Sequence, residues 1–126
     1  MSRTVLVTGG SGALGKALVY RFREADDRVF FTYHKNEKIA QEISQKTGAI
    51  PLYADLTRKE DVDRMASELE KEVAHLDILI NNAGATQVMP FALIEEEDWD
   101  FILSANLKTM FLTTKAVVRG MISARR

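Results

Sequence analysis

Four glycines stand close together near the start of this sequence, in the segment Thr8-Gly9-Gly10-Ser11-Gly12-Ala13-Leu14-Gly15. Glycine permits backbone angles with positive φ and lets a ligand approach the main chain closely. Where such a loop leads into a helix, the N–H groups of the first helical turn and the helix dipole favour a phosphate. The segment therefore predicts a phosphate-binding loop, in preference to a glycine-rich turn that is needed only for packing.

Two kinds of phosphate loop compete for this segment. Residues 10–16 fit the P-loop pattern G-x-x-x-x-G-K, but the next residue is Ala17, where a P-loop needs Ser or Thr to hold Mg²⁺. The apolar run Ile78–Ile80 is followed by Asn81 and Asn82, and not by an acidic residue that would hold the metal's water shell. A P-loop therefore lacks both of its metal positions, and the dinucleotide fingerprint G-x-G-x-x-G at Gly10, Gly12 and Gly15 remains.

The elements that must position this loop alternate along the chain. Short runs rich in β-branched residues predict strands at Thr4–Thr8, Arg28–Tyr33, Ile50–Ala54 and Asp77–Asn81. Helical spacing predicts helices that begin near Leu14, that include Ile39–Ile43 and end at Gly48, that follow Thr57, and that run from about Trp99 to the C-terminus. This order predicts an α/β fold with a parallel sheet, right-handed crossovers and helices on both faces.

Local signals add further expectations for these elements. Thr57 and Glu60 form a T-x-x-E capping box that should open the third helix, and Pro51 suits a strand at a sheet edge. The run Ile78–Ile80 is apolar on both faces, as in a buried parallel strand. We interpret the acidic residues 95–98 as a helix start, Trp99 as a core anchor, and His75 as a structural residue at the end of the third helix.

Composition narrows the classes of function. The 126 residues carry a formal net charge of −1 and contain no cysteine, which excludes disulfides and thiolate chemistry. The balanced charge argues against nucleic acid or an anionic membrane surface as the main partner. No apolar run reaches the about 18 residues that a membrane span requires, so we expect a cytoplasmic protein. His34 and His75 lack suitable partners, and we predict no metal site.

Four motifs in order resemble the short-chain dehydrogenase/reductase family, over the whole length of the chain. They are T-G-x-x-x-[A/G]-x-G at Thr8–Gly15, with Ala13 where the family usually has its middle glycine, Asp55 after the third strand, Asn81-Asn82-Ala83-Gly84 after the fourth, and Asn106 with Thr-Lys eight residues later. The chain looks most similar to 3-oxoacyl-acyl-carrier-protein reductases and glucose dehydrogenase-like members. The resemblance implies a Rossmann-type sheet with strand order 3-2-1-4 and a single NAD(P)-binding domain, of which residues 1–126 form the N-terminal portion.

The resemblance also implies roles for individual residues. Asp55 would accept a hydrogen bond from the adenine amino group; its alternative role as a helix cap is disfavoured because Thr57 should supply that cap. Asn106 would help to hold a proton-relay water and is the only catalytic residue of the family that we identify here. The cofactor-binding residues implied are Thr8, Gly9, Ser11, Gly12, Leu14, Gly15, Tyr33, His34, Lys35, Asp55, Leu56, Asn82, Ala83 and Gly84.

The end of the second strand bears on the choice of cofactor. An NAD-preferring site places an acidic residue there, which would repel the 2′-phosphate of NADP. Here the position is Tyr33, followed by His34 and Lys35, and nearby cations favour a phosphate. Gly12 argues the other way, because family members that use NADP often carry a basic residue at this position. We predict NADP(H) in preference to NAD(H).

The family's proton donor is missing from the sequence. The family uses Tyr in Y-x-x-x-K together with a Ser, whereas Tyr20, Tyr33 and Tyr53 are followed four residues later by Glu24, Glu37 and Thr57. We therefore expect a fold truncated before its fifth strand and a chain that is inactive alone. The complete protein would interconvert a small-molecule ketone, of the 3-oxoacyl kind, and a secondary alcohol.

Two alternatives to an enzyme stay open. The chain could bind the nucleotide without catalysis, or it could be a self-associating interaction module. An open edge at the fourth strand and a final helix that is apolar nearly all round favour association. In the family, that helix packs at a subunit interface, so we expect a homo-oligomer through it.

Overall fold

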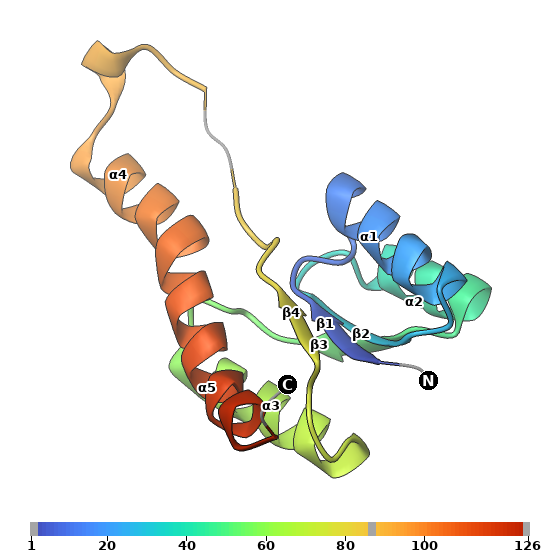
Figure 1. Ribbon diagram of the computed structural model, residues 1–126. Helices are drawn as coiled ribbons and strands as arrows, with labels where there is room; N and C mark the ends of the chain where they lie inside the picture. The colour runs from blue at the N-terminus through green and yellow to red at the C-terminus, as the bar shows by residue number, and fades with distance from the viewer. Residues whose placement is uncertain (1–2, 86–87, 125–126) are drawn as a thin grey trace.

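A computed structural model describes residues 3–85 and 88–124 of the chain, and a parallel sheet lies at its centre (Figure 1). Its strands are β1 (Thr4–Val7), β2 (Arg28–Tyr33), β3 (Ile50–Tyr53) and β4 (Ile78–Ile80). They lie in the order β3-β2-β1-β4, and every pairing is parallel. The predicted strand order is therefore confirmed, as is the edge position of the strand that contains Pro51.

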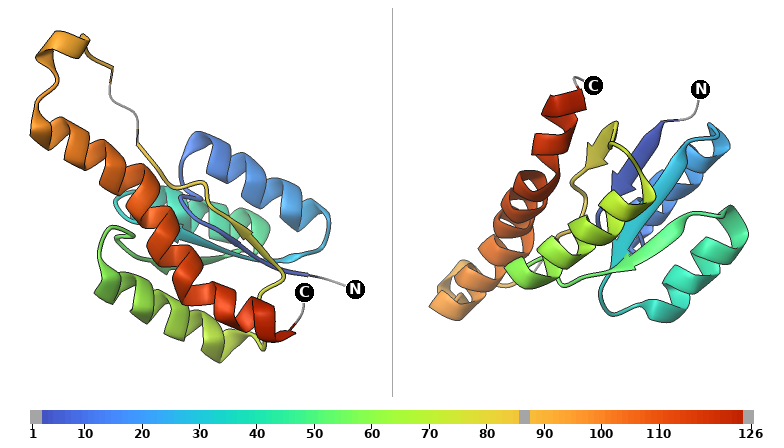
Figure 2. Two further views of the ribbon diagram at one scale, coloured as in Figure 1. Left: turned by 60° about the vertical axis from the view of Figure 1, so that its left-hand side comes forward. Right: turned by 90° about the horizontal axis from the view of Figure 1, so that it is seen from below.

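Helices cover both faces of the sheet, as predicted (Figure 2). Helices α1 (Ala13–Glu24) and α2 (Glu37–Thr47) lie on one face, and α3 (Lys59–Glu72) and α5 (Thr109–Ala124) lie on the other. Side chains alternate along β1 between two cores. Val5 and Val7 join Val19 and Ile43 beneath α1 and α2, whereas Leu6 joins Phe30, Met65 and Val117 beneath α3 and α5.

Strand β4 differs from the expectation of a strand buried on both faces. Its residues Ile78, Leu79 and Ile80 are only half-buried, because β4 pairs with β1 alone and forms one edge of the sheet. The short apolar run is thus typical of a parallel strand. How deeply such a strand is buried depends on the elements packed beside it, which the run does not specify.

The last helical region is interrupted. It consists of α4 (Glu96–Leu103), a π-helical segment η2 (Ser104–Lys108) and α5, and a 3₁₀ turn η1 (Phe91–Leu93) precedes it. The acidic start is confirmed, since Glu95 and Asp98 form a reciprocal capping box at the beginning of α4. The interpretation of Trp99 as a core anchor is wrong: its side chain is 62% exposed, because α4 extends beyond the sheet (Figure 1).

The beginning and end of α3 also correct two expectations. The N-cap is Arg58, and no side chain caps the helix, so the predicted capping box of Thr57 and Glu60 is wrong. The Thr57 hydroxyl donates instead to Asp55 Oδ1 at 2.6 Å. This bond forms part of a local turn, and such local side-chain bonds compete with helix capping. Helix α3 ends at Glu72, and His75 therefore lies beyond it, with Nε2 at 3.4 Å from Asp77 Oδ1.

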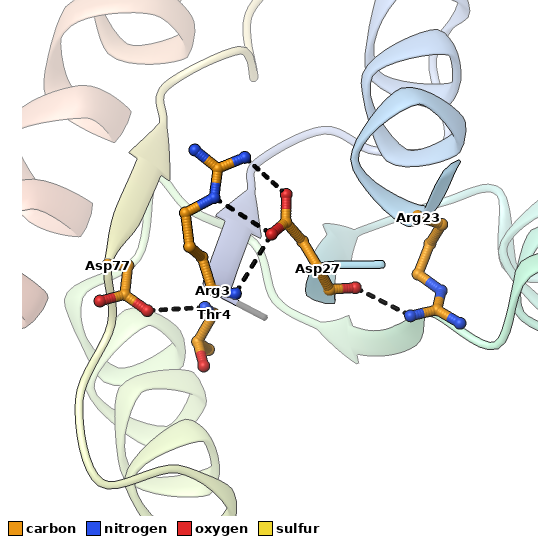
Figure 3. Close-up of polar contacts among 5 residues, drawn as sticks. All are labelled: Arg3, Thr4, Arg23, Asp27 and Asp77. Atoms are coloured by element: carbon orange, nitrogen blue, oxygen red, sulfur yellow. Dashed lines mark hydrogen bonds and ion pairs between the residues drawn. The ribbon is translucent and has the colours of Figure 1, made fainter. Parts of the chain in front are cut away.

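A cluster of polar residues connects the amino ends of the strands through hydrogen bonds (Figure 3). Arg3 donates three hydrogen bonds to the Asp27 carboxylate, from its backbone N–H, Nε and Nη2. The N–H of Thr4 donates to Asp77 Oδ2 at 2.8 Å, and Arg23 Nη1 donates to the Asp27 carbonyl at 2.8 Å. This cluster joins β1 to the segments that precede β2 and β4. It lies at the amino ends of the strands, whereas the glycine loop lies at their carboxyl ends.

Candidate functional site

The residues predicted to bind the cofactor lie at or just after the carboxyl ends of the strands: Tyr33 is the last residue of β2, and Leu14 and Gly15 lie in the first turn of α1. Because the strands are parallel, the loops after β1, β2, β3 and β4 meet at one edge of the sheet. These loops carry residues 8–12, 34–36, 54–58 and 81–85. In an open α/β sheet, this edge is where ligands bind.

The glycine loop is closely packed except at one position. Gly9 has φ of +69°, and a Cβ on Gly10 would lie 2.5 to 2.8 Å from the Phe31 side chain. Gly12, by contrast, is exposed, and a Cβ there would meet only the Gly9 carbonyl oxygen, at 3.6 Å. Gly12 is also the N-cap of α1, with no side-chain hydrogen bond to the first turn. The N–H groups of that turn therefore remain available to an anion.

Thr8 and Asn82 join the glycine loop to the loop after β4. The Thr8 hydroxyl accepts the N–H groups of Asn82 and Ala83, both at 2.9 Å, and donates to the Ile80 carbonyl. Asn82 Nδ2 donates to the carbonyls of Thr8 and Gly9, at 3.0 and 3.2 Å. Thr8 is 2% exposed, so its hydroxyl shapes the loop and is not presented to a ligand.

Thr32 supports the same loop, and sequence reasoning did not single it out. Its hydroxyl accepts the N–H of Gly9 at 3.0 Å, and its carbonyl accepts the N–H of Gly10 at 3.0 Å. A buried Thr in a strand has too common a pattern to indicate this role. Only the pairing of β2 with β1 reveals it.

Asn106 reaches the loop after β4 from the π-helical segment. Its Nδ2 donates to the carbonyl of Ala85 at 2.9 Å, and its Oδ1 accepts the N–H of Ala85 at 3.3 Å. A side chain on Gly84 would collide with Asn106 Oδ1, which explains the glycine there. Asn106 Nδ2 also donates to the Ile102 carbonyl, the acceptor that a regular α-helix gives to the backbone N–H four residues on.

The Asp55 carboxylate has two inequivalent oxygens. Oδ1 accepts the N–H of Thr57 at 3.0 Å and its hydroxyl at 2.6 Å, whereas Oδ2 lies 3.9 Å from His34 Nε2. The bond from the Thr57 hydroxyl is the main reason that the pKa of Asp55 lies below its usual range. Asp55 is therefore ionised at neutral pH and is a hydrogen-bond acceptor there. The Asp55 carboxylate also forms part of the turn before α3. Because Thr57 does not cap that helix, the expectation that Thr57 leaves Asp55 without a capping role no longer has support.

The end of β2 presents aromatic and basic groups. Tyr33 packs edge-on against Tyr53 with ring centroids 5.7 Å apart, and the His34 ring lies 5.9 Å from the Tyr53 ring. Burial raises the pKa of Tyr33. His34 and Lys35 are exposed, so both side chains can reach a ligand at the end of this strand.

Residues 3–85 and 88–124 contain neither a group of metal ligands nor a membrane-spanning helix. No three His, Asp or Glu side chains are grouped so that they could hold a metal ion. No helix in this part of the chain is long and apolar enough to cross a membrane. Lys16, which a P-loop would direct toward phosphate, has its amine 5.8 Å from the centre of the Tyr20 ring.

Comparisons with known proteins agree with this architecture. The sequence profile described as "short chain dehydrogenase" matches residues 3–126. The chain is 33% identical over 127 residues to nodulation protein G of Rhizobium meliloti, and 31% identical over 128 residues to acetoacetyl-CoA reductase of Allochromatium vinosum. These matches cover 98% and 97% of this chain but 51% and 52% of the relatives. The chain thus spans about half the length of the curated relatives it matches.

A solved structure gives the same result for the fold. The 3-ketoacyl-(acyl-carrier-protein) reductase from Brucella melitensis, determined in complex with NADH, superposes with a TM-score of 0.89 at 23% identity. The match covers 96% of this chain and 50% of that one. It establishes that the two chains share the fold.

Proposed function

This chain belongs to the short-chain dehydrogenase family, and on that premise we propose that it is the NADP(H)-binding part of an oxidoreductase. The observation that supports this most directly is the uncapped start of α1 at an edge where four loops meet. There the first-turn N–H groups would receive the pyrophosphate. Asp55, Tyr33, His34 and Lys35 would contact the adenosine half. The nicotinamide, when bound, supplies or accepts a hydride.

Calorimetric titration of the 126-residue chain with NADPH tests this proposal. We expect a dissociation constant in the micromolar range, which corresponds to about −8 kcal/mol. The variant Lys16→Ala separates this site from a P-loop, because that lysine is essential only in the latter. It should leave the affinity within about twofold. Absence of heat at millimolar NADPH would refute the proposed function.

For the complete protein, we propose a reaction between a 3-oxoacyl-like ketone and a secondary alcohol. The names of two similar proteins, acetoacetyl-CoA reductase and 3-ketoacyl-(acyl-carrier-protein) reductase, support this substrate class. Asn106 would hold a water that relays a proton. Its π-helical segment supports such a role, since π-bulges are frequent at functional sites.

The 126 residues contain no Tyr with Lys four positions later, and we propose that this chain alone does not catalyse the reaction. General acid catalysis by a positioned donor contributes about 10²- to 10⁴-fold to a rate. NADPH consumption with an acetoacetyl thioester should therefore stay at the background rate. Clear turnover by the purified chain would contradict this.

The preference for NADP(H) over NAD(H) rests on the end of β2. No acidic side chain occupies Tyr33's position, and His34 and Lys35 are exposed beside it. Gly12 offers no cation, and the similar Brucella protein was determined with NADH, so the preference should be modest. Titrations with NADPH and NADH at matched salt decide it, and equal or tighter NADH binding would overturn it.

A second candidate function is self-association, with or without the nucleotide. Along α4, η2 and α5, large apolar side chains are exposed, among them Trp99, Phe101, Leu107, Phe111 and Ile122. Strand β4 is an edge as well. Light scattering tests this: a dimer that does not bind NADPH favours the interaction module, whereas a monomer that binds NADPH argues against it.

A further inference from the structure

The turn between β3 and α3 is held by side chains of α3. Asp61 Oδ2 accepts the backbone N–H of Asp55 at 2.8 Å. Arg64 Nη2 donates to the carbonyl of Tyr53 at 2.7 Å, and its Nη1 lies 3.6 Å from Asp61 Oδ1. The backbone on both sides of Ala54 is thus attached to the first turns of α3.

Asp61 is well placed for this role because little of it faces solvent. Its side chain is 17% exposed, whereas Asp63, two residues later, is 56% exposed and pairs with Lys59 at 2.7 Å. A hydrogen bond to a shielded carboxylate is stronger than one to an exposed group. Asp61 therefore restrains the position of the Asp55 backbone, and Asp63 provides a matched surface carboxylate that does not contact the turn.

Thr57 then restrains the Asp55 side chain. Its N–H and hydroxyl both donate to Oδ1, which fixes the rotamer. Oδ2, which has His34 Nε2 at 3.9 Å but accepts no hydrogen bond from the described residues, keeps acceptor capacity for a ligand. An ionised carboxylate can accept a hydrogen bond from an amino group, but it has no proton to donate to a carbonyl. The arrangement can therefore distinguish a base that presents an amino group from one that presents a carbonyl at the same place.

We propose that Asp61 and Thr57 are positioning residues that give the site selectivity for an adenine base over a 6-oxo base. This inference rests on the proposed function, since it presumes that a dinucleotide binds at the carboxyl edge. Asp61 fixes the backbone of Asp55, Thr57 fixes its carboxylate, and Oδ2 accepts the 6-amino group. A hypoxanthine base carries a carbonyl there, and the two oxygens would repel each other.

The test is a ratio of two dissociation constants, measured by calorimetry on the 126-residue chain. The ligands are NADPH and its hypoxanthine analogue, which share the phosphates, the riboses and the nicotinamide. The wild-type chain should bind NADPH about 10-fold more tightly, the usual scale for one hydrogen bond to a charged group. Asp61→Ala and Thr57→Val should each reduce this ratio to about twofold or less. A general loss of stability would weaken both ligands alike and leave the ratio unchanged.

Two further variants serve as controls. Asp61→Asn keeps an oxygen that can accept the Asp55 N–H, so it should retain most of the 10-fold ratio. Asp63→Ala removes a carboxylate from the same helix without touching the turn and should also retain it. Should Asp61→Ala fail to fold, Thr57→Val decides, because the proposal requires a fixed Asp55 carboxylate.

Each outcome has one meaning. A ratio that collapses in Asp61→Ala and Thr57→Val but persists in both controls supports the proposal. A ratio near one in the wild-type chain, or one that no variant changes, overturns it while leaving the dinucleotide site intact. If neither ligand binds to the wild-type chain, the proposed function itself is wrong and this inference is wrong with it.

Discussion

The carboxylate of Asp27 accepts three hydrogen bonds from Arg3, at 3.1 Å from the backbone N–H, 3.1 Å from Nε and 2.8 Å from Nη2 (Figure 3). The two side chains differ in environment: Asp27 is 3% exposed, and Arg3 is 53% exposed. The charged group that most needs a partner is thus the carboxylate. The Arg3 side chain is the main reason that the pKa of Asp27 lies below its usual range.

Asp27→Asn should lower the free energy of unfolding at pH 7 by about 1 to 3 kcal/mol, because the amide group brings a donor against the donors of Arg3. Urea denaturation followed by circular dichroism measures this. Asp63→Asn, which removes an exposed pair with Lys59, should change stability by about 0.5 kcal/mol or less. Equal effects of the two variants would contradict the importance of the Arg3 contact.

The stability of the chain should fall in acid, and Asp27 should account for part of the fall. A carboxyl whose pKa is lowered by folding contributes its full stability above its unfolded pKa of about 3.9. That contribution is lost as the pH falls through the lower, folded pKa. Denaturation at a series of pH values should therefore show the Asp27→Asn deficit shrinking below about pH 4. A deficit that stays constant into acid would speak against this account.

Two glycine-to-alanine changes should have opposite effects. Gly120 lies within α5, where a Cβ would meet no atom within 4 Å, beside a cavity of about 60 Å³ between α3 and α5. Gly120→Ala should stabilise the chain by about 0.5 to 1 kcal/mol, because alanine has the higher helix propensity. Gly48 ends α2 with φ of +80°, and Gly48→Ala should destabilise by about 1 kcal/mol. Thermal midpoints distinguish the two.

A second matched pair lies in the glycine loop. Gly12→Arg should fold normally, since the position is open, and it should strengthen NADPH binding by about fivefold at low salt. The gain should decline as salt is added. Gly10→Ala should destabilise by about 1 to 3 kcal/mol, because its Cβ would be forced against the buried Phe31 ring. Titration and thermal melts of both variants test this, and a folded, fully stable Gly10→Ala would be evidence against the packing described.

Buried threonines on α5 provide a third pair. The Thr113 hydroxyl is buried with no hydrogen-bond partner among the described residues, whereas Thr109 Oγ1 donates to the Ala105 carbonyl at 3.0 Å. Thr113→Val should therefore raise the free energy of unfolding by about 1 kcal/mol, and Thr109→Val should lower it by about the same amount. Chemical denaturation of the two variants gives the comparison, and a loss of stability in Thr113→Val would show that its hydroxyl is satisfied.

The end of β2 should control the choice of cofactor. Tyr33→Asp introduces a carboxylate that would accept hydrogen bonds from the ribose hydroxyls and repel a 2′-phosphate. We expect it to shift the ratio of NADPH to NADH affinity by about 10-fold or more toward NADH. Tyr33→Phe keeps the ring against Tyr53 and should leave the ratio unchanged. An unchanged ratio in Tyr33→Asp would remove this residue from the 2′-phosphate site.

Most of the sheet could be predicted because its signals are local. Each strand is a short apolar run between glycine or polar segments, and the glycine loop marks its own place after β1. The misplaced cap of α3 shows the limit. Thr57 has the right spacing from Glu60 for a capping box. Its hydroxyl donates instead to the carboxylate of Asp55, which is nearer in the sequence.

Other site residues depend on contacts between distant segments. Asn106 could be placed in a helix from its neighbours, but neither its π-helical segment nor its bonds to Ala85 and Ile102 could be predicted from that local pattern. Thr32 and Asp61 have no distinctive pattern in the sequence and enter the site only through pairing and packing. Trp99 looks like a core residue by type, yet whether it is covered depends on how far α4 extends past the sheet.

The bond between Thr8 and Asn82 has a consequence for the order in which the site is made. The two residues are 74 positions apart in the sequence, so the glycine loop, although synthesised first, cannot be completed until the segment after β4 exists. At about 5 to 20 residues per second, the growing chain carries an unfinished phosphate loop for several seconds. As the chain lengthens, we expect the N–H groups of Gly9 and Gly10, which donate to Thr32, to become protected from hydrogen exchange early. The N–H groups of Asn82 and Ala83, which donate to the Thr8 hydroxyl, should become protected later, because they depend on this long-range contact.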